Sequence, residues 1–161
     1  MTKLVPMQAT TFAVYRESSI QAYAEENVVA RRWSEENALE LARENFETLL
    51  PQGLDTPDNY LYEIQITLDD TNASTHAGYL WFAVVTKNGV RTGYVYDLEV
   101  FLEFRRQGHA ERAFEALEPI ARELGLASIA LHVFAHNPSA RTLYAKLGYK
   151  VTGHNMLKHL A

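Results

Sequence analysis

The chain has 161 residues, of which 47% are hydrophobic and 22% charged, and its net charge is −5. This length suits one domain with a substantial core, so we expect residues 1–161 to form a single domain. The acidic balance argues against generic binding to nucleic-acid phosphates. The sequence contains no cysteine, which excludes disulfides, Cys-ligated metals and a Cys nucleophile.

The N-terminus lacks the features of a targeting segment. Residues 1–8 have no apolar run of the kind found in a signal peptide. No window approaches the ~18 apolar residues of a membrane span. We therefore expect a cytoplasmic protein with neither a membrane nor a nucleic-acid partner.

The first part of the chain reads as a strand followed by two helices. Residues 4–7 are expected to form a short strand, and Pro6 indicates a sheet edge. Apolar residues at helical spacing predict helices over 10–30 and 35–50, the second with Ser34 as its N-cap. The buried positions expected on these helices are Phe12, Tyr15, Ser19, Tyr23 and Val28 on the first, and Ala38, Leu41, Ala42, Asn45, Phe46 and Leu49 on the second.

Three strands follow. Residues 60–68 alternate and are rich in β-forming residues, which predicts a strand, and 69–75 form a turn. Residues 78–86 are almost continuously apolar, as in a strand buried on both faces. Asn88-Gly89 is a strong hairpin signal leading into a strand over 91–101. These three strands should form an antiparallel meander.

The last part alternates helices and strands. We expect a helix over 108–124, a strand over 128–134, a helix over 138–146 and a final strand from Gly148 onward. The predicted order is β-α-α-β-β-β-α-β-α-β. The fold class is therefore α/β (α+β), with a mixed, mostly antiparallel central sheet and helices on both faces.

Two segments carry chemistry. Residues 98–110 run from a strand through a basic, Gly-containing loop into a helix start, where unpaired N–H groups and the helix dipole favour an anion. Residues 131–149 form a strand, a turn, a short helix and a Gly stop. The first resembles the R/Q-x-x-G-x-G/A loop of the GCN5-related N-acetyltransferase (GNAT) superfamily, and the second resembles its N-x-x-A-x-x-L-Y-x-x-x-G-(Y/F) signature.

The resemblance implies acetyl-CoA as the acyl donor. Val100 and Leu102 would pair with the pantetheine arm through their backbones, although Leu102 replaces a proline that is common in the family. The pyrophosphate would meet the backbone N–H groups of Arg105, Arg106, Gln107, Gly108, His109 and Ala110. The two arginines would pair with phosphates, or they are simply solvated side chains on a helix shoulder.

The second motif implies two further roles. Tyr144 stands at the family's tyrosine position, where a hydroxyl protonates the departing CoA thiolate. Its alternative is a core aromatic on a short helix. Asn137 would hydrogen-bond the cofactor arm, or cap the helix that begins at Pro138, or do both.

The sequence offers several candidates for the general base. Some family members have a Glu about six residues before the position of Val100, but here that residue is Tyr94. Asp97, Glu99 or a water chain would serve instead, with His76 as a weaker candidate. Strand alternation places both acids on one face, opposite Tyr94, Tyr96, Leu98 and Val100.

The acceptor pocket should combine aromatic walls with an acid that anchors an ammonium. Its candidate residues, most of which would alternatively belong to the core, are Tyr23, Glu26, Trp33, Trp81 and Tyr96. His132 and His136 share a strand face, but two histidines without a third ligand make a poor zinc site, so we expect no metal.

These features predict an acetyl-CoA-dependent N-acetyltransferase that moves the acetyl group to a primary amine of a small molecule or peptide. Because there is no cysteine, transfer is expected by direct attack in a ternary complex. The alternative is a catalytically degenerate CoA-binding sensor or partner module, since the family's carboxylate is missing at Tyr94. A generic nucleotide-binding domain ranks last, because the sequence has no Walker loop or G-x-G-x-x-G. A homodimer is a family expectation only.

Overall fold

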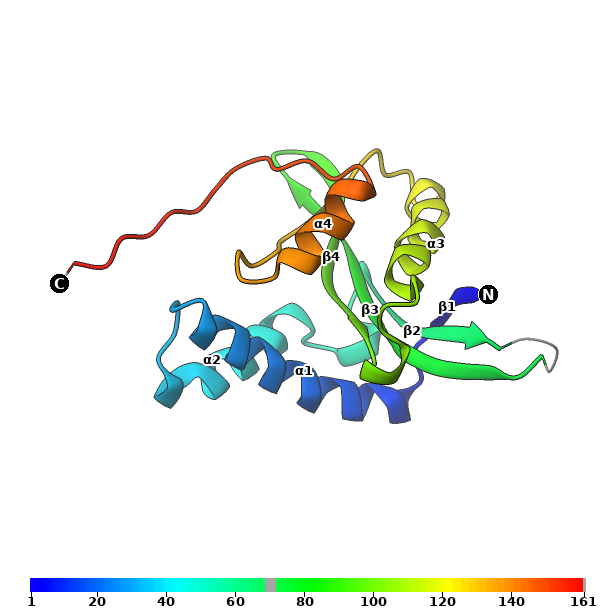
Figure 1. Ribbon diagram of the computed structural model, residues 1–161, viewed down its shortest axis with the longest axis horizontal. Coiled ribbons are helices and arrows are strands. Elements are labelled where there is room, and N and C mark those ends of the chain that lie inside the picture. Colours follow the sequence, from blue (N-terminus) through cyan, green and yellow to red (C-terminus); the bar gives the residue numbers. More distant parts are fainter. Residues whose placement is uncertain (69–71, 161) are drawn as a thin grey trace.

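The fold centres on one five-stranded sheet with the strand order β1-β2-β3-β4-β5 (Figure 1). The computed structural model describes residues 1–68 and 72–160. The strands are β1 (Thr2–Pro6), β2 (Asn59–Thr67), β3 (Ser74–Lys87), β4 (Val90–Val100) and β5 (Ile129–Leu131). β1 to β4 pair antiparallel in sequence order, so the predicted meander is confirmed.

The helices lie on both faces of the sheet, as predicted (Figure 1). They are α1 (Ala9–Val29), α2 (Glu35–Leu49), α3 (His109–Glu123) and α4 (Pro138–Lys146), with short 3-10 turns η1 (Gly53–Asp55) and η2 (Leu102–Phe104). α1 and α2 cover one face, and their core includes Tyr15, Ile20, Phe46 and Trp81. α3 and α4 cover the other face, where the core includes Leu80, Phe82, Phe114 and Leu117.

The amphipathic pattern of α2 is narrower than expected. Ala38, Ala42 and Phe46 are buried, but Asn45 is exposed and 37% of Leu41 remains accessible. The predictions for Asn45 and Leu41 are therefore wrong. Burial repeats every four residues along this helix, because Ala38, Ala42 and Phe46 are the positions that lie against the sheet.

β4 and β5 share only a short parallel contact. Gly93, Tyr94 and Val95 pair with Ile129, Ala130 and Leu131. Beyond Val95, no strand in the described part of the chain pairs with this edge of β4. The two strands thus diverge, and the edge of β4 that leads to Val100 is open.

The C-terminal part differs from the sequence prediction. β5 is only three residues long rather than spanning 128–134, and residues 149–160 have no regular secondary structure, so the predicted last strand is absent. A strand needs a hydrogen-bonded neighbour, and none is supplied here by the described chain. Of the predicted turn at 69–75, residues 69–71 lie outside the described residues. None of the described helices is both long and apolar enough to cross a bilayer.

A β-bulge interrupts β4. Trp81 lies opposite Asp97, whereas the next residue of β3, Phe82, lies opposite Val95, so Tyr96 is the extra residue. Tyr96 packs against the core on the α1–α2 side, and Asp97 bonds a side chain of α1 on that same side. The expectation that these two residues face opposite sides is therefore wrong, because the bulge shifts the alternation by one residue.

Candidate active site

The loop between β4 and α3 has the backbone shape of an anion cradle. Arg106 and Gly108 adopt left-handed conformations, with φ of 63° and 80°, and α3 begins directly afterward at His109. Within the described residues, the backbone N–H groups of residues 106–111 donate no hydrogen bond. These groups and the helix dipole favour a negatively charged ligand.

Two arginine side chains at this loop donate hydrogen bonds to backbone carbonyl oxygens of the loop and of the end of β4. Arg105 Nε donates to the Val100 carbonyl oxygen at 2.7 Å. Arg112, which sequence analysis missed, folds back from the first turn of α3 and donates through Nη2 to the Gln107 carbonyl at 2.6 Å. Such a return is readable from helix geometry, since side chains lean toward the N-terminus. The loop is therefore braced before any ligand arrives.

Other predicted loop residues differ in their surroundings. Arg106 is exposed, and its guanidinium has no partner among the described residues. His109 Nδ1 lies 3.1 Å from Thr2 Oγ1, which ties the loop to β1. Burial, followed by the nearby Arg112, lowers the pKa of His109. Ala110 packs against the core on the α3–α4 side of the sheet. Leu102, in η2, is 76% exposed.

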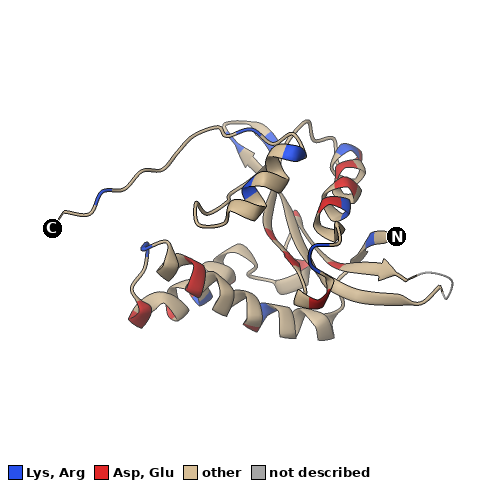
Figure 2. Cartoon of the chain, in the orientation of Figure 1, with Lys and Arg blue, Asp and Glu red and all other residues tan. Residues whose placement is uncertain are grey.

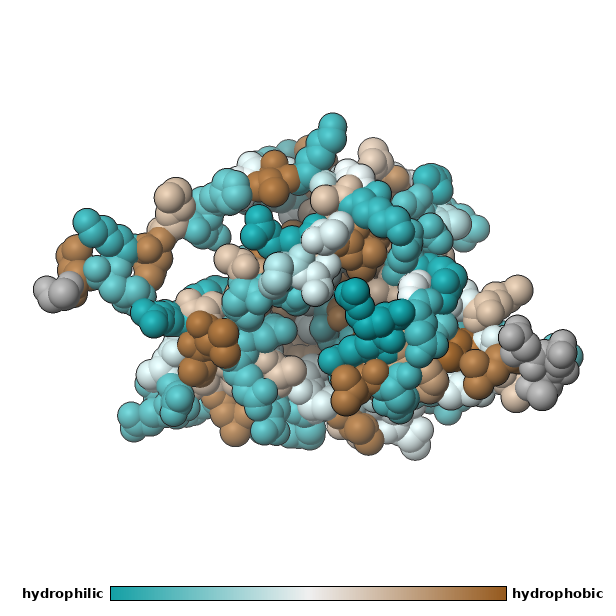
Figure 3. Space-filling view, viewed as in Figure 1, coloured by the Kyte–Doolittle hydropathy of each residue, from teal (hydrophilic) through white to brown (hydrophobic). Residues whose placement is uncertain are grey.

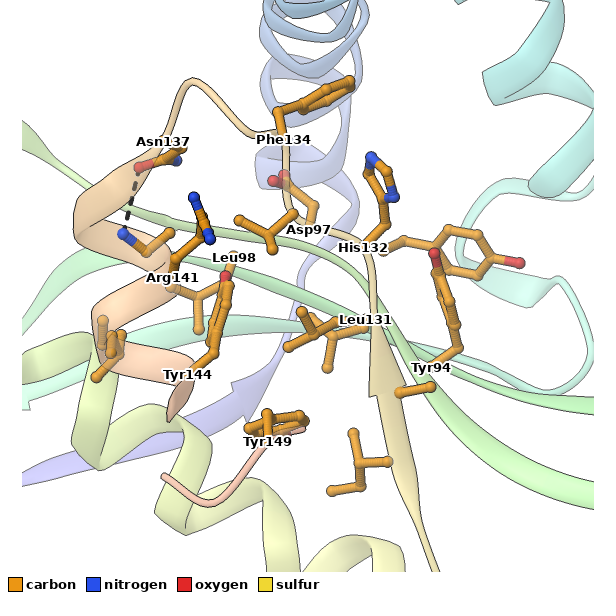
Figure 4. Close-up of a pocket in the computed structure, with 18 of the residues that line it drawn as sticks. Tyr94, Asp97, Leu98, Leu131, His132, Phe134, Asn137, Arg141, Tyr144 and Tyr149 are labelled. Atoms are coloured by element: carbon orange, nitrogen blue, oxygen red, sulfur yellow. Dashed lines mark hydrogen bonds between the residues drawn. The ribbon is translucent and has the colours of Figure 1, made fainter. Parts of the chain in front are cut away.

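Tyr144 points into the cleft between β4 and α4. Figure 4 shows its ring rising from α4, with its oxygen on the side where Leu98 and Asp97 lie. Its ring packs edge-on against Phe114 and Tyr149, with centroids 5.4 and 5.8 Å apart. Burial, followed by the charges of Asp97 and Glu26, raises the pKa of Tyr144. The hydroxyl is therefore protonated at neutral pH.

Asn137 caps α4, as the sequence suggested. Its Oδ1 accepts the Ala140 N–H at 3.3 Å (Figure 4). Its side-chain amide remains at the cleft, beside the exposed Arg141 of the same helix. Arg141 is a further cation near the cleft that the sequence motifs did not single out.

Asp97 is the most perturbed acid in the cleft. Its Oδ2 accepts a 2.9 Å hydrogen bond from the hydroxyl of Tyr15, a fully buried residue of α1. Burial raises the pKa of Asp97 to about 7, with smaller upward contributions from Glu99 and Glu26, while the Tyr15 hydrogen bond opposes the rise. A carboxylate with a pKa near neutrality is suited to exchange protons with a substrate.

Both acidic and basic groups border the cleft. Figure 2 shows the basic loop before α3 next to acidic positions on β4. Glu26, on α1, lines the same cleft, and burial raises its pKa. The loop therefore offers positive charge where an anion would bind, and Asp97 and Glu26 offer carboxylates elsewhere in the cleft.

The predicted acceptor residues separate into two groups. Tyr23, Glu26, Trp81 and Tyr96 line the cleft, whereas Trp33 does not. Trp81 is only 5% exposed and stacks beneath Tyr96 at 4.6 Å. Trp33 packs edge-on against Tyr23 at 5.4 Å and supports that ring from behind.

His132, which lines the cleft, and His136, which does not, share no strand face. His132 and His136 lie beyond β5 in irregular chain, on either side of Phe134. In residues 1–68 and 72–160, no group of three or more His, Cys, Asp or Glu side chains is arranged to hold a metal ion.

Comparison with known proteins identifies the family. A model of the acetyltransferase (GNAT) family matches residues 20–149, which include both the loop and the Tyr144 segment. The chain belongs to this family. It is an N-acetyltransferase, as its curated GNAT relatives are.

Two relatives from Bacillus subtilis (strain 168) match this GNAT chain over 157 residues. YycN, an uncharacterized N-acetyltransferase, is 36% identical, and the match spans 98% of this chain and 97% of YycN. YdgE, also an uncharacterized N-acetyltransferase, is 32% identical with the same coverage. The crystal structure of YycN has a TM-score of 0.91 and 35% identity, covering 100% of this chain and 99% of that one.

A more distant GNAT structure supports the fold. AAC(6')-Iy, solved with the bisubstrate analogue CoA-S-monomethyl-acetylneamine, has a TM-score of 0.63 and covers 100% of this chain and 99% of its own. At 13% identity, it shows likeness of fold alone.

Proposed function

We propose that this N-acetyltransferase transfers the acetyl group of acetyl-CoA to a primary amine of a small molecule or peptide, by direct attack in a ternary complex. The observation that carries the proposal is the shared cleft. An anion cradle, a tyrosine hydroxyl and a carboxylate with a pKa of about 7 all border it. Because all layers of the fold contribute to this cleft, we infer that residues 1–161 act as one domain.

The negatively charged pyrophosphate of acetyl-CoA fits the basic loop before α3. The pyrophosphate would be bound by the free N–H groups of residues 106–110 and by the unpaired Arg106. The pantetheine arm would follow the open edge of β4 toward Val100. Arg105 already occupies the Val100 carbonyl at 2.7 Å, so this pairing requires the Arg105 side chain to share that oxygen or leave it.

Asp97, rather than Glu99, would act as the general base. Its raised pKa lets it accept the proton of an incoming ammonium near neutral pH, after which the amine nitrogen attacks the thioester carbon. Tyr15 fixes the carboxylate orientation through its 2.9 Å hydrogen bond. Asp97 would thereby take the role of the glutamate that some family members have at the position of Tyr94.

Tyr144 would complete the reaction. When the carbon–sulfur bond breaks, its protonated hydroxyl would donate a proton to the departing thiolate. Asp97 and Tyr144 belong to β4 and α4, on two sides of the cleft (Figure 4). Asp97 would take one proton from the ammonium, and Tyr144 would give one to the thiolate. The nitrogen loses a second proton as the amide forms, and this proton would restore the Tyr144 hydroxyl through solvent. The net change is the one proton that Asp97 then passes to solvent.

The acceptor amine would enter between Tyr23, Glu26 and Tyr96. Aromatic faces and a carboxylate together favour a cation. Glu26 supplies that charge from α1, so we infer that the acceptor arrives as an ammonium.

Two measurements test this function. Calorimetric titration with acetyl-CoA should give a saturable binding curve, and no binding at millimolar ligand would remove the basis of the proposal. A thiol-release assay over a panel of primary amines should then identify at least one amine that accelerates CoA release. Binding without release for any amine would favour the alternative, a CoA-binding sensor or partner module.

A further inference from the structure

The turn between α1 and α2 presents two arginines to the cleft. Arg31 and Arg32 follow the end of α1, and both line the cleft that Tyr23 and Glu26 also border. Both arginines are exposed. Among the described residues, neither guanidinium has a hydrogen bond, an ion pair or a ring contact. Guanidinium groups that are free in a cleft are suited to bind an anionic group.

The backbone of this turn is fixed by the end of α1. The N–H groups of Arg32 and Trp33 both donate to the Asn27 carbonyl oxygen, at 2.9 and 3.3 Å. Asn27 is fully buried, and its side-chain amide donates to the Tyr23 carbonyl oxygen at 2.8 Å. Arg31 has a φ of 58°, a left-handed conformation that glycine and asparagine adopt more easily than arginine. A long cationic side chain at such a position indicates a role for that side chain.

The opposite charge lies on the same helix but does not neutralise these arginines. Glu26 lines the cleft, and in the part of the chain that the structure describes no ion pair joins it to Arg31 or Arg32. Arg32 acts instead on His132, whose pKa is lowered by burial and then by this arginine. The charge of Arg32 is therefore felt inside the cleft. A cleft that keeps a carboxylate and a guanidinium apart fits a ligand that carries both charges.

The positive charge at this turn is separate from the loop before α3. Figure 1 shows the turn at the far end of the helical pair, away from that loop, and Figure 2 shows basic positions at both places. Figure 3 shows the surface hollowed between α1 and the segment before α4, with hydrophilic residues among those at the rim. One anionic group does not reach both places, so the turn is free to bind an anion other than the pyrophosphate.

We propose that the acceptor carries an anionic group besides its amine, and that Arg31 and Arg32 bind this group while the amine lies at Glu26 and Asp97. The inference rests on the proposed acetyl transfer and narrows its acceptors to amino acids and other amines that bear a carboxylate or a phosphate. Either anion accepts paired hydrogen bonds from a guanidinium. An amine without an anion loses this contact, and a diamine brings a second positive charge toward the arginines.

The first test compares acceptors of matched length in the thiol-release assay, using the unmodified chain. Glycine, β-alanine, γ-aminobutyrate and ε-aminocaproate are compared with ethylamine, propylamine, butylamine and hexylamine, in which a methyl group replaces the carboxylate. Phosphoethanolamine tests a phosphate, and putrescine tests a second amine. At least one anionic amine should exceed its neutral partner and putrescine about tenfold or more in kcat/KM, the usual effect of one charge-assisted hydrogen bond.

The second test removes the two charges. The double variant Arg31→Gln with Arg32→Gln should raise the KM of the preferred anionic amine about tenfold or more and leave its kcat within about threefold. Acetyl-CoA affinity should stay within about twofold, because the pyrophosphate binds elsewhere. The matched control is Arg43→Gln with Lys87→Gln, which makes the same change in net charge at two residues that do not line the cleft. This control should keep the preference of the unmodified chain.

Four outcomes separate this inference from the proposed function. Equal or higher kcat/KM for the neutral amines or putrescine would overturn the inference and leave acetyl transfer intact. Weakened acetyl-CoA binding in the arginine variant would assign the arginines to the coenzyme instead. An unchanged KM would mean that they only complement the C-terminal end of α1. If no amine releases CoA, the proposed function fails, and calorimetry of the anionic amines with the CoA-bound protein decides, since no binding at millimolar amine would overturn the inference as well. The amine series needs no variant, so it decides even if the double variant does not fold.

Discussion

The two walls of the cleft are packed very differently. On the β4 wall, Asp97 is bonded to Tyr15, which is fully buried between α1 and the sheet. On the opposite wall, Tyr144 belongs to α4, a nine-residue helix with no fully buried residue. Burying a large apolar side chain contributes about 1.5–3 kcal/mol, so the first wall resists displacement far more than the second.

This difference separates two tasks. A general base works best when its environment is fixed, because its pKa depends on neighbours that must stay in place. A group that meets a departing thiolate can belong to an element that moves with the cofactor. The predictions below test this division, beginning with the largest expected effect.

Asp97→Asn should remove the base while preserving its shape. We expect kcat/KM to fall by about 10²- to 10⁴-fold, the usual contribution of a positioned general base. Acetyl-CoA affinity, measured by calorimetry, should change less than about threefold. The matched control is Glu99→Gln, on the same strand, which should retain activity within about threefold. A larger loss in Glu99→Gln would transfer the role to Glu99.

Tyr144→Phe should lower kcat by about 10- to 100-fold, because the thiolate would leave without a positioned proton donor. Acetyl-CoA affinity should remain nearly unchanged, as the ring still packs against Phe114. Tyr149→Phe removes a hydroxyl from the same aromatic group and serves as the control. Unchanged turnover in Tyr144→Phe would reject this residue as the acid.

Asp97→Asn should also stabilise the protein above neutral pH. The pKa of Asp97 is raised from 3.8 to about 7, so the folded state loses stability as pH rises from about 4 to about 7, while the unfolded carboxyl ionises freely. An asparagine at this position has no carboxyl to ionise, and its side-chain oxygen can still accept the hydrogen bond from the Tyr15 hydroxyl. We expect a gain of about 1–2 kcal/mol in unfolding free energy at pH 8, reduced from the ideal value because Asp97 is partly exposed to solvent.

The pH dependence of this gain is its control. Denaturant unfolding of both proteins should give equal stability at about pH 2.5, where the carboxyl is neutral in both states, and a constant difference above about pH 8, where it is ionised in both. A difference independent of pH would mean that the ionisation of Asp97 is not its cause.

Tyr15→Phe should produce the smallest change, about three- to tenfold in rate at pH 6. The Tyr15 hydrogen bond lowers the pKa of Asp97 against the upward effects of burial, Glu99 and Glu26. Without it, the acidic limb of the kcat/KM profile should move to higher pH, with activity recovering near pH 9. Tyr79→Phe, a neighbouring ring 4.8 Å away, should leave the limb in place. A uniform loss at every pH would indicate a structural role alone.

Much of the fold follows from local patterns. Helix spacing, the Asn88-Gly89 hairpin and Pro138 at a helix start placed most elements within one or two residues of their bounds. The final strand was wrong because a strand depends on a partner, which the sequence pattern of Gly148 onward does not contain. The predicted length of β5 was wrong for the same reason, because only three of its residues have a partner on β4.

The candidate site was only partly readable. The loop glycine at 108 and the Tyr144 segment could be recognised from their motifs. The link between Tyr15 and Asp97 spans 82 positions, so Tyr15 looked like an ordinary core residue of a helix. The choice between Asp97 and Glu99 depends on burial, which alternation alone does not reveal.

The extra residue at Tyr96 has a consequence for how β4 tolerates change. Along β4, the type of replacement that keeps function should alternate from one residue to the next, apolar at one position and polar at the following one. That alternation should reverse its phase between Val95 and Asp97. Deleting Tyr96 would restore regular alternation and leave the Asp97 carboxylate toward α1, but it would remove the ring that borders the cleft and stacks on Trp81. The bulge therefore adds an aromatic wall to the cleft without turning the carboxylate.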